Sequence, residues 1–404
     1  MARVLLLLPT STYRATDFID AAQTLGAEVV VGSNEEQALA DAMGARALEL
    51  DFDDPRAAAE AIVENCREMP VDAVVAVDDQ GVLTAALAAE RLGLKHNSPE
   101  SVALTRDKAG MREALSNSAV RQPEFELARG AAEAVAAAER IGFPCVLKPV
   151  SLSASRGVIR VDDAGAAQDA ARRIVAILEE SEADDEQRIL VESYIPGIEV
   201  AVEGLLRGGR LEVLAIFDKP DPLEGPYFEE TIYTTPSRHP RQDQDAIVEA
   251  TERAVGELGL TEGPIHAEAR FNGSGVWLLE LAARSIGGLC ARTLRFGLGV
   301  SLEELILRHA LGLPVTDLKL SAAAGVMMLP IPRAGCLQEV SGREDAETVP
   351  GITGVEITIP IGREVRPLPE ADRYLGFMFA KADTPDEVET ALRTAYGKLG
   401  VLIG

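Results

Sequence analysis

One short turn constrains the fold of this chain more than any other feature. Asn272-Gly273-Ser274-Gly275 lies between two runs in which apolar and polar residues alternate. Asn-Gly in this setting is the strongest short-range signal of a β-hairpin, so we expect two adjacent antiparallel strands. Glu268 precedes the turn and Glu280 follows it, and side chains on one face of a strand recur at every second residue. The two carboxylates are therefore expected to converge across the hairpin.

Two convergent carboxylates repel each other unless a cation neutralises them. Hard oxygen ligands suit Mg²⁺, which proteins often bind together with nucleotide phosphates. The hairpin therefore predicts a site for Mg²⁺ and a nucleotide at Glu268 and Glu280. The alternative interpretation is a solvated strand pair with acidic edges, because charged edge strands are common.

Length and charge limit the class of the protein and its partners. A chain of 404 residues exceeds one ordinary core, so two or three domains are expected. Its 39 basic and 65 acidic residues give a net charge of −26, which argues against nucleic acid and anionic membranes as partners. No stretch approaches the roughly 20 apolar residues of a membrane span. The cysteines stand singly, at Cys66, Cys145, Cys290 and Cys336, which favours a reducing cytoplasm.

The order of the expected elements divides the chain into three parts. Residues 1–97 alternate apolar strands with amphipathic helices, which predicts a Rossmann-like domain with a parallel sheet. No GxGxxG follows the first strand, so a dinucleotide cofactor is not expected. Arg14 lies in the loop after that strand, where it either contacts substrate or is a plain surface arginine.

The second and third parts begin at a turn and at a change of pattern. Asn97-Ser98-Pro99 predicts a turn before a helix that is capped by Ser98 and carries Asp107 and Lys108. Residues 98–320 continue with a second alternating unit, in which a lobe spans about 120–195, and then become rich in strands. Residues 321–404 are expected to form a small α+β domain. The fold class is therefore α/β, with α+β character overall.

Lys148 ends the apolar run FPCVLKP, and a loop of small hydroxyl residues with Gly157 follows it. A lysine beside backbone N–H groups and hydroxyls suits phosphate oxygens, and glycine allows a close approach. The alternative is a hairpin loop with a chance lysine.

A second motif, ESYIPGIE, follows the next expected strand. A connector of this kind offers backbone donors and acceptors to an adenine edge, and a nearby carboxylate can accept from ribose hydroxyls. Glu192, Tyr194, Ile195 and Glu199 are therefore candidates for nucleotide binding, although most such glutamates are surface residues.

In order and spacing, these motifs resemble those of the ATP-grasp superfamily. The segments that carry the resemblance cover most of residues 95–320: TRDK with Lys108, FPCVLKP, SASRGV, ESYIPGIE and HAEARF…LLELAARSIGG. Within the superfamily the chain looks like the carboxylate-amine ligases, and most like the L-amino-acid ligases that join amino acids into dipeptides. Two further segments, TYRATDFIDAAQTLGAEVVVGS and GPYFEETIYTTP, also look like that branch.

The resemblance implies a fold, cofactors and substrates. The fold would be an ATP-grasp fold with a Rossmann-like N-terminal domain, a two-lobed nucleotide-binding core and a small C-terminal domain. The cofactors would be ATP and Mg²⁺, or Mn²⁺ in its place. The substrates would be a carboxylate and an amine, both amino acids, joined through an acyl phosphate with release of ADP and phosphate. Many relatives are dimers, which leaves a homodimer open.

The resemblance also implies roles for the residues that match the family motifs. The nucleotide would be bound by Lys108, Lys148, Ser153, Ser155, Gly157, Glu192, Tyr194, Ile195 and Glu199. The metal would be bound by Glu268 and Glu280. The substrates would be bound by Arg284, Gly287, Gly288, Glu230 and Tyr233. Lys148 and Arg284 would also stabilise the charge that develops during phosphoryl transfer.

Two departures from the family pattern bear on these roles. Ala282 stands where many members have asparagine, so metal binding would depend on two carboxylates and the phosphates. Tyr233 stands where relatives in the amino-acid ligase branch often have histidine, and Glu230 would pair with an amine. His266, near the metal pair, is interpreted as a structural histidine rather than a catalytic one.

Two other functions stay open on the sequence alone. A carboxylase or purine-pathway type of ligase would use the same nucleotide site with another acceptor. A nucleotide sensor with a degenerate site would bind ATP without turnover, and Ala282 is the feature that favours it.

Overall fold

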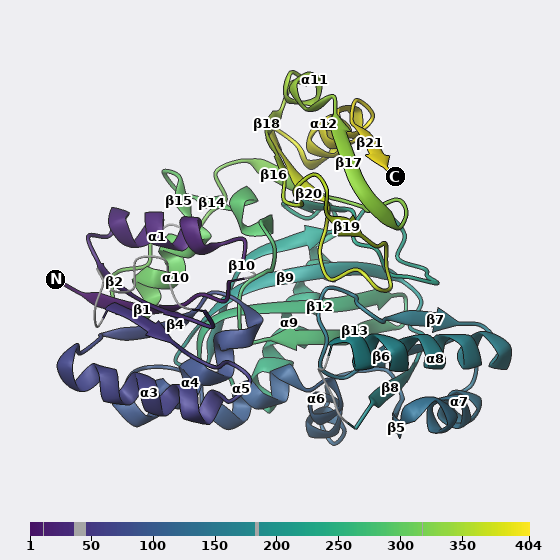
Figure 1. The fold of residues 1–404 in the computed structure, drawn as a ribbon, viewed down its shortest axis with the longest axis horizontal. Helices are drawn as coiled ribbons and strands as arrows, with labels where there is room; N and C mark the ends of the chain where they lie inside the picture. The colour runs from purple at the N-terminus through teal and green to yellow at the C-terminus, as the bar shows by residue number, and fades with distance from the viewer. Residues whose placement is uncertain (11, 36–45, 182–185, 317) are drawn as a thin grey trace.

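The computed structural model describes residues 1–10, 12–35, 46–181, 186–316 and 318–404. A large antiparallel sheet occupies the middle of the molecule (Figure 1). The N-terminal domain lies at one end of it, and the lobe of residues about 120–195 lies at the other. Within the described ranges, every helix is too short or too polar to cross a membrane. All four cysteines are free.

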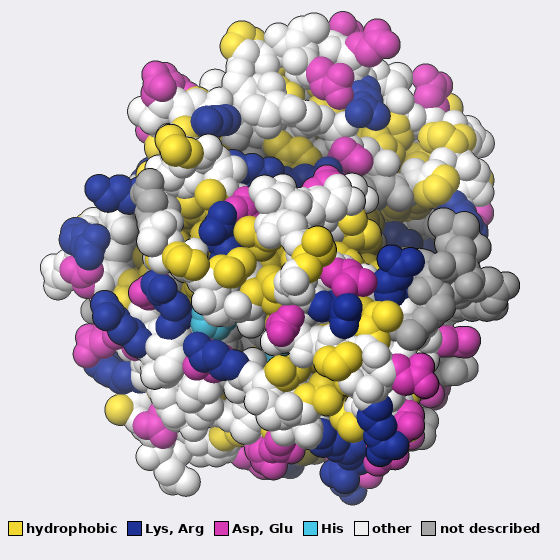
Figure 2. All heavy atoms as spheres, turned by 90° about the vertical axis from the view of Figure 1, so that its left-hand side faces the viewer, with side chains coloured by type: hydrophobic (Ala, Val, Ile, Leu, Met, Phe, Trp, Pro, Cys, Tyr) yellow, Lys and Arg dark blue, Asp and Glu magenta, His cyan; other side chains and the backbone are white. Residues whose placement is uncertain are grey.

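The N-terminal domain contains the predicted parallel sheet, in the strand order β3-β2-β1-β4. Its strands are β1 (Arg3–Leu7), β2 (Glu28–Ser33), β3 (Ala47–Glu49) and β4 (Ala73–Ala76). Its helices are α1 (Ala15–Thr24), α3 (Pro55–Glu68), the short η2 (Asp79–Gly81) and α4 (Val82–Leu92). The face of the molecule that includes this domain carries basic and acidic side chains interspersed, so no charge of one sign dominates it (Figure 2).

The segment after residue 97 was predicted to form one helix that carries Asp107 and Lys108, but it forms two. Ser98 caps a helix as expected, since its Oγ accepts a hydrogen bond from the Ser101 N–H at 3.2 Å. This helix, α5 (Pro99–Arg106), ends before Asp107, and a second helix, α6 (Lys108–Leu115), begins after it. Asp107 has φ −114° and ψ 105°, and its carboxylate accepts from the Gly110 N–H at 2.9 Å. Aspartate is a strong N-cap, so it interrupts the helix and starts another at Lys108.

The lobe has a four-stranded antiparallel sheet in the order β5-β8-β6-β7. Its strands are β5 (Phe125–Arg129), β6 (Cys145–Pro149), β7 (Ile159–Val161) and β8 (Arg188–Ser193). Helices α7 (Gly130–Ile141) and α8 (Ala164–Ser181) pack on this sheet through a core in which alanines are frequent.

The central sheet has eight strands in the order β13-β12-β9-β10-β11-β16-β20-β18, all paired antiparallel. Five come from the middle of the chain: β9 (Ile198–Arg207), β10 (Arg210–Asp218), β11 (Ile232–Thr235), β12 (Glu262–Asn272) and β13 (Gly275–Ala282). Three come from its last part: β16 (Ala323–Leu329), β18 (Ile352–Ile357) and β20 (Gly376–Ala382). The C-terminal segment therefore shares its sheet with the core.

The remaining elements surround this sheet. Helices α9 (Arg241–Glu257) and α10 (Leu302–Ala310), the turn η3 (Cys290–Thr293) and the strands β14 (Arg295–Phe296) and β15 (Val300–Ser301) belong to the middle of the chain. The C-terminal segment adds β17 (Gly335–Ser341), α11 (Arg343–Glu347), β19 (Glu364–Val365), α12 (Pro385–Tyr396) and β21 (Gly400–Ile403). Within the C-terminal segment, β19, β17 and β21 form a separate three-stranded sheet.

The predicted hairpin is present, but it depends on a β-bulge. From Asn272 opposite Gly275, the register runs regularly to Ala269 opposite Leu278, and then shifts so that Glu268 faces Glu280. Leu279 is the extra residue. Without this bulge Glu268 would pair with Leu279, and Glu280 would point to the opposite face of the sheet. Simple alternation along the two strands did not predict the bulge that brings the carboxylates together.

Arg14 joins the N-terminal domain to the core. It is 2% exposed, so of the two alternatives the plain surface arginine was wrong. Its Nη2 lies 2.7 Å from Glu303 on α10, and its Nη1 donates to the Ser285 Oγ at 2.8 Å and the Ile286 carbonyl at 3.0 Å. A buried cation with three partners holds the loop that follows β13.

Replacing Arg14 with methionine tests this contact. The change leaves the buried Glu303 carboxylate without its cation, so the free energy of unfolding should fall by about 3–5 kcal/mol in urea titrations. Arg3→Met is the matched control, because Arg3 pairs with Glu28 at 2.7 Å but is about one quarter exposed. It should cost at most about 1 kcal/mol. Equal losses in the two variants would contradict this role of Arg14.

Candidate active site

A cavity of about 1010 Å³ opens where the N-terminal domain, the lobe and the central sheet meet. Residues of all three parts line it, among them Asp79, Lys148 and Glu268. Every predicted site residue except Gly157 belongs to its lining: Lys108, Lys148, Ser153, Ser155, Glu192, Tyr194, Ile195, Glu199, Glu230, Tyr233, Glu268, Glu280, Arg284, Gly287 and Gly288.

Gly157 has a different position from the one its motif suggests. Its φ is +73°, and a Cβ there would lie 3.0 Å from the Cδ of Pro149. Its N–H donates to the Pro369 carbonyl at 2.9 Å. Glycine is therefore required for the turn and for contact with Pro149, and its backbone donor is already used within the protein.

Glu268 on β12 and Glu280 on β13 are direct cross-strand partners, and their side chains are 21% and 29% exposed. Both reach the cavity, and Lys108 Nζ lies 3.6 Å from Glu280 Oε2. Two half-buried carboxylates on one face supply the oxygen ligands that Mg²⁺ prefers. The donor set therefore fits a divalent cation held together with phosphate oxygens.

Lys148 on β6 is held by a buried carboxylate. Its Nζ lies 2.7 Å from Glu192 Oε2, and the other oxygen of Glu192 accepts from Arg112 Nε at 2.7 Å. Burial opposes the charge on Glu192, but Arg112 and Lys148 outweigh it and keep the pKa of that carboxyl below its usual range. Burial, with Arg112, lowers the pKa of Lys148 against the opposing effect of Glu192. The Glu192 side chain thus positions the lysine that is predicted to bind phosphate, a role for Glu192 that the sequence did not predict.

Arg112 was also missed by the sequence, although it is fully buried. Besides Glu192 it donates to the Leu279 carbonyl at 2.6 Å, so it connects the lobe to the bulge of the hairpin. Arg112 lies on α6, outside the segments that carry the resemblance to the ATP-grasp superfamily. An arginine in an amphipathic helix is usually solvated. The amphipathic pattern of the helix therefore gave no signal for it.

The loop after β6 is tied to Lys108 and is conformationally strained. Lys108 Nζ donates to the Leu152 carbonyl at 2.7 Å. Ala154 and Ser155 have φ of 56° and 55°, a left-handed conformation that residues other than glycine rarely adopt. Strain of this kind is typical of ligand-binding loops.

Glu199 and the connector are held by Arg270, another residue that the sequence analysis did not single out. Arg270 Nε donates to Glu199 Oε2 at 2.8 Å, and its Nη1 donates to the Ile195 carbonyl at 2.9 Å. The guanidinium carbon lies 5.2 Å from the centre of the Tyr194 ring. One buried arginine thus fixes the predicted ribose-binding carboxylate and the predicted adenine slot.

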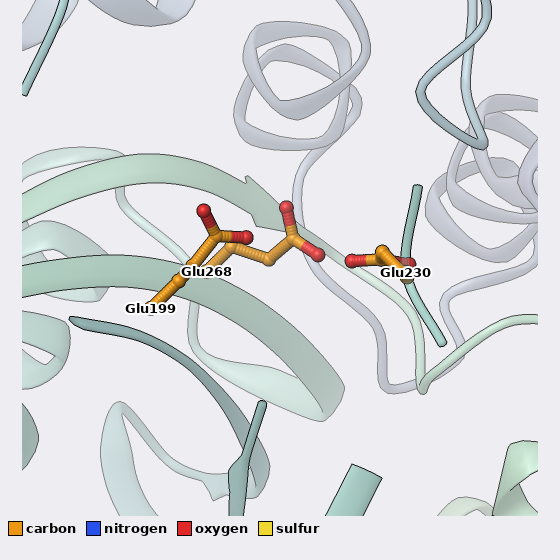
Figure 3. A group of neighbouring side chains, drawn as sticks. All are labelled: Glu199, Glu230 and Glu268. Atoms are coloured by element: carbon orange, nitrogen blue, oxygen red, sulfur yellow. The ribbon is translucent and has the colours of Figure 1, made fainter. Parts of the chain in front are cut away.

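Lys219, just after β10, forms the centre of the site. Its side chain is 3% exposed, and its Nζ lies 2.7 Å from Glu199, 2.5 Å from Glu230 and 3.0 Å from Glu268. The three carboxylates point toward one another from β9, β12 and the loop before β11 (Figure 3). One ligand oxygen from each lies within 4.8 Å of the others. Their predicted roles differ: ribose for Glu199, amine for Glu230 and metal for Glu268.

The charges in this cluster affect one another. Burial opposes a charge on Lys219, but the three carboxylates outweigh it and raise its pKa well above the usual value. Burial raises the pKa of Glu230 to about 6, with Lys219 opposing and Glu268 adding to the rise. Burial also opposes the charge on Glu268, but Lys219 and His266 lower its pKa well below the usual range. Lys219 follows an apolar run, as Lys148 does, and that signal could have identified it.

The loop after β13 is fixed by backbone and side-chain contacts. Glu203 accepts from the Ile286 N–H at 3.0 Å, and its other oxygen lies 2.5 Å from His266 Nδ1. His266 is buried, and Glu203 overcomes the effect of burial to raise its pKa to about 9. His266 also lines the cavity, with its Nε2 3.6 Å from Glu268 Oε1, so its structural role stays a prediction. Arg284 Nε donates to Asp79 Oδ1 at 3.2 Å, which directs the arginine toward the N-terminal domain.

A segment before β20, residues 367–374, connects the loop after β6 and helix α8 with the cavity. At one end of the segment, the Pro369 carbonyl accepts from Gly157, and Glu370 Oε2 accepts from Arg173 Nη2 on α8 at 2.8 Å. At the other end, the Tyr374 hydroxyl lies 3.4 Å from Glu230 Oε2. We call residues 367–374 the strap.

Comparisons with known proteins show which proteins the chain is similar to. Family models match three separate parts of the chain: the ATP-grasp N-terminal domain at residues 19–96, the ATP-grasp domain at 141–293 and the L-amino acid ligase C-terminal domain 2 at 327–403. The chain belongs to the ATP-grasp superfamily. Within the superfamily it is similar to the L-amino-acid ligases.

Individual ATP-grasp proteins show how far the similarity extends. The alanine–anticapsin ligase of Bacillus subtilis is 28% identical over 265 residues, which cover 61% of this chain and 56% of that ligase. The match thus spans little more than half of that relative. The L-amino acid ligase structure from Bacillus licheniformis has a TM-score of 0.82 at 24% identity, covering 100% of this chain and 99% of the other.

A second ATP-grasp structure extends the likeness of fold to another branch. It is the carboxyaminoimidazole ribonucleotide synthase from Aspergillus clavatus complexed with ATP, with a TM-score of 0.74 and 16% identity, covering 98% of each chain. The ATP-grasp fold is therefore shared across branches that use different substrates.

Lys219→Met tests whether the ammonium group neutralises the three carboxylates. The variant keeps an unbranched side chain but leaves three buried like charges, so a divalent cation should replace the missing charge. Addition of Mg²⁺ should then raise the midpoint of thermal unfolding more in Lys219→Met than in wild type. A cation at 100 times its dissociation constant adds about 2.7 kcal/mol.

Lys95→Met is the control, because Lys95 pairs with Glu262 at 2.9 Å and is largely exposed. It should show the wild-type response to Mg²⁺. The same response in Lys219→Met as in wild type would refute the role assigned to the ammonium group.

Proposed function

We propose that this chain is an ATP-dependent carboxylate-amine ligase that joins L-amino acids through an acyl phosphate and releases ADP and phosphate. The observation that carries the proposal is the convergence of the carboxylates Glu268 and Glu280 with Lys108, Lys148 and Arg284 on one cavity. Similarity to L-amino-acid ligases supports amino acids as the substrates.

Phosphoryl transfer depends chiefly on positioning and on neutralising charge. Mg²⁺ bound at Glu268 and Glu280 supplies charge neutralisation at the phosphates. Lys108 and Lys148 contact phosphate oxygens, and Arg284, held by Asp79, binds the carboxylate of the first amino acid. An oxygen of that carboxylate attacks the γ-phosphorus, and the bond to the ADP oxygen breaks.

Amide formation completes the reaction. The amine nitrogen of the second amino acid attacks the carbonyl carbon of the acyl phosphate, the bond to the phosphate oxygen breaks, and the proton that the amine loses leaves with the phosphate. Glu230 pairs with the ammonium group of the first amino acid, and the Tyr233 hydroxyl orients Glu230 by donating to its Oε1 at 2.5 Å. The loop with Ser153 and Ser155 closes over the nucleotide and excludes water, which would hydrolyse the acyl phosphate.

Hydroxylamine tests the acyl phosphate directly, because it converts such intermediates into stable hydroxamates without a second amino acid. We expect hydroxamate and ADP from the wild-type protein with Mg-ATP and an L-amino acid. Glu280→Gln removes a metal ligand and should lower the rate by at least about a hundredfold. Mass spectrometry of the hydroxamate identifies the first substrate, and omission of hydroxylamine with pairs of amino acids identifies the dipeptide.

Glu212→Gln is the matched control, because Glu212 lies on β10 of the same sheet and pairs with Arg207 away from the cavity lining. It should retain the wild-type rate. ADP release that depends on bicarbonate rather than an amino acid would favour the carboxylase type of reaction. Binding of ATP without hydroxamate from any carboxylate would favour a nucleotide sensor.

The pKa of Glu230 predicts a pH dependence. Burial, the largest cause, raises this pKa to about 6, and the carboxyl must be ionised to bind an ammonium group. The kcat/KM for the first amino acid should therefore rise as pH increases through about 6. Glu230→Gln should lower kcat/KM at pH 7.5 by about 10- to 100-fold, since a hydrogen bond to a charged group is worth about 1.5–3 kcal/mol.

The neighbouring Glu229 offers the control, since it lies outside the main cavity and its pKa is also raised by burial. Glu229→Gln should leave both the rate and the pH profile unchanged. A flat profile from pH 5 to 8 in the wild-type protein would exclude Glu230 as the ammonium-binding group.

A further inference from the structure

One wall of the cavity is the open end of the hydrophobic core. Ile286, Cys290, Met328 and Phe377 line the cavity and are each at most 5% exposed. All four belong to the core cluster that also contains Phe217 and Tyr233 and extends into the N-terminal domain. We call these four residues and Tyr374 the apolar wall. Because the wall belongs to a packed core, its position is fixed before any ligand binds.

The contacts within the apolar wall make it continuous. Met328 on β16 and Phe377 on β20 are direct cross-strand partners. Cys290 Sγ lies 3.6 Å from Met328 Sδ, and the Tyr374 and Phe377 rings are 6.0 Å apart at an edge-to-face angle of 69°. Aromatic rings and polarisable sulfur atoms form an apolar surface that adapts to differently shaped side chains.

The apolar wall lies directly beside the ammonium-binding carboxylate. The Tyr374 hydroxyl is 3.4 Å from Glu230 Oε2. At the other end of the wall, Ile286 is two residues after Arg284 in the same loop. An amino acid whose ammonium group binds Glu230 and whose carboxylate binds Arg284 therefore has this wall next to its Cα.

The charged groups beside the wall form ion pairs, and in the proposed function Glu230 and Arg284 also bind the ammonium and carboxylate groups of the substrate. Lys219 contacts three carboxylates, Arg284 contacts Asp79, and Arg373 Nε donates to Asp372 Oδ1 at 2.9 Å. The five residues of the apolar wall are themselves uncharged. A carboxylate or ammonium side chain placed against the wall would lose its hydration without gaining a partner there, which is strongly unfavourable.

We infer that the first amino acid, the one activated as an acyl phosphate, carries an uncharged apolar side chain that packs on the apolar wall. This inference rests on the proposed ligase function and specifies its substrate class. Side chains such as those of leucine, methionine and phenylalanine fit the chemistry of the wall, and those of aspartate, glutamate, lysine and arginine do not.

The hydroxamate assay tests the inference on the wild-type protein. With hydroxylamine as the only nucleophile, kcat/KM should be at least about 100-fold higher for L-leucine, L-methionine or L-phenylalanine than for L-aspartate or L-lysine. Comparable values for the charged amino acids would overturn the inference while leaving the ligase function intact. Silence with every amino acid, under conditions where ATP binds, would overturn both.

Two adjacent methionines provide a matched pair of variants. Met328 faces the cavity, whereas Met327 points to the other side of β16 and packs in the C-terminal core. Met328→Ala enlarges the space beside the wall, so the ratio of kcat/KM for L-phenylalanine to that for L-alanine should rise by about tenfold. Met327→Ala removes the same atoms from a side chain that is also buried, and it should leave this ratio unchanged.

Thermal unfolding of both variants shows whether each remains folded at the assay temperature. A ratio that shifts only in Met328→Ala supports contact between the substrate side chain and the wall. An unchanged ratio in a folded Met328→Ala, or an equal shift in both variants, would overturn that contact.

Discussion

The pairing of one buried ammonium group with three carboxylates is the interaction on which this site depends. Glu199, Glu230 and Glu268 come from three different parts of the chain, and Lys219 touches all three. Three carboxylates this close would repel one another at a large cost in a cavity wall. The sheet order places β9 between β10 and β12, so the lysine after β10 reaches carboxylates on both of the other strands.

Pairing of buried charges recurs throughout the molecule. Arg112 and Lys148 share Glu192, Arg14 holds Glu303, and Arg270 holds Glu199. Each acid in these interior pairs has a cation, so the pairs themselves add little net charge to the interior. The cavity lining includes two lysines, Lys108 and Lys148, despite a net charge of −26 for the chain.

The sequence predicted the elements of the fold and the family motifs, because both are local. The Asn272–Gly275 hairpin and the parallel N-terminal sheet were predicted from alternation and turn residues. The bulge at Leu279 was not, because a register shift depends on pairing between strands. Asp107 was placed inside a helix, because its capping role was overlooked beside the lysine that follows. Arg112, Arg270 and Lys219 act through partners distant in the chain, which no local pattern reports.

The strap has a thermodynamic consequence for how the two ligands bind. It accepts a hydrogen bond from Gly157 at the nucleotide loop, and Tyr374 at its other end lies beside Glu230. Any shift of the strap that favours one ligand changes the surroundings of the other. Linkage then requires reciprocity: the factor by which a bound amino acid changes the affinity for ATP equals the factor by which ATP changes the affinity for the amino acid. A strap that moves on binding would make the two binding equilibria depend on each other through residues 367–374.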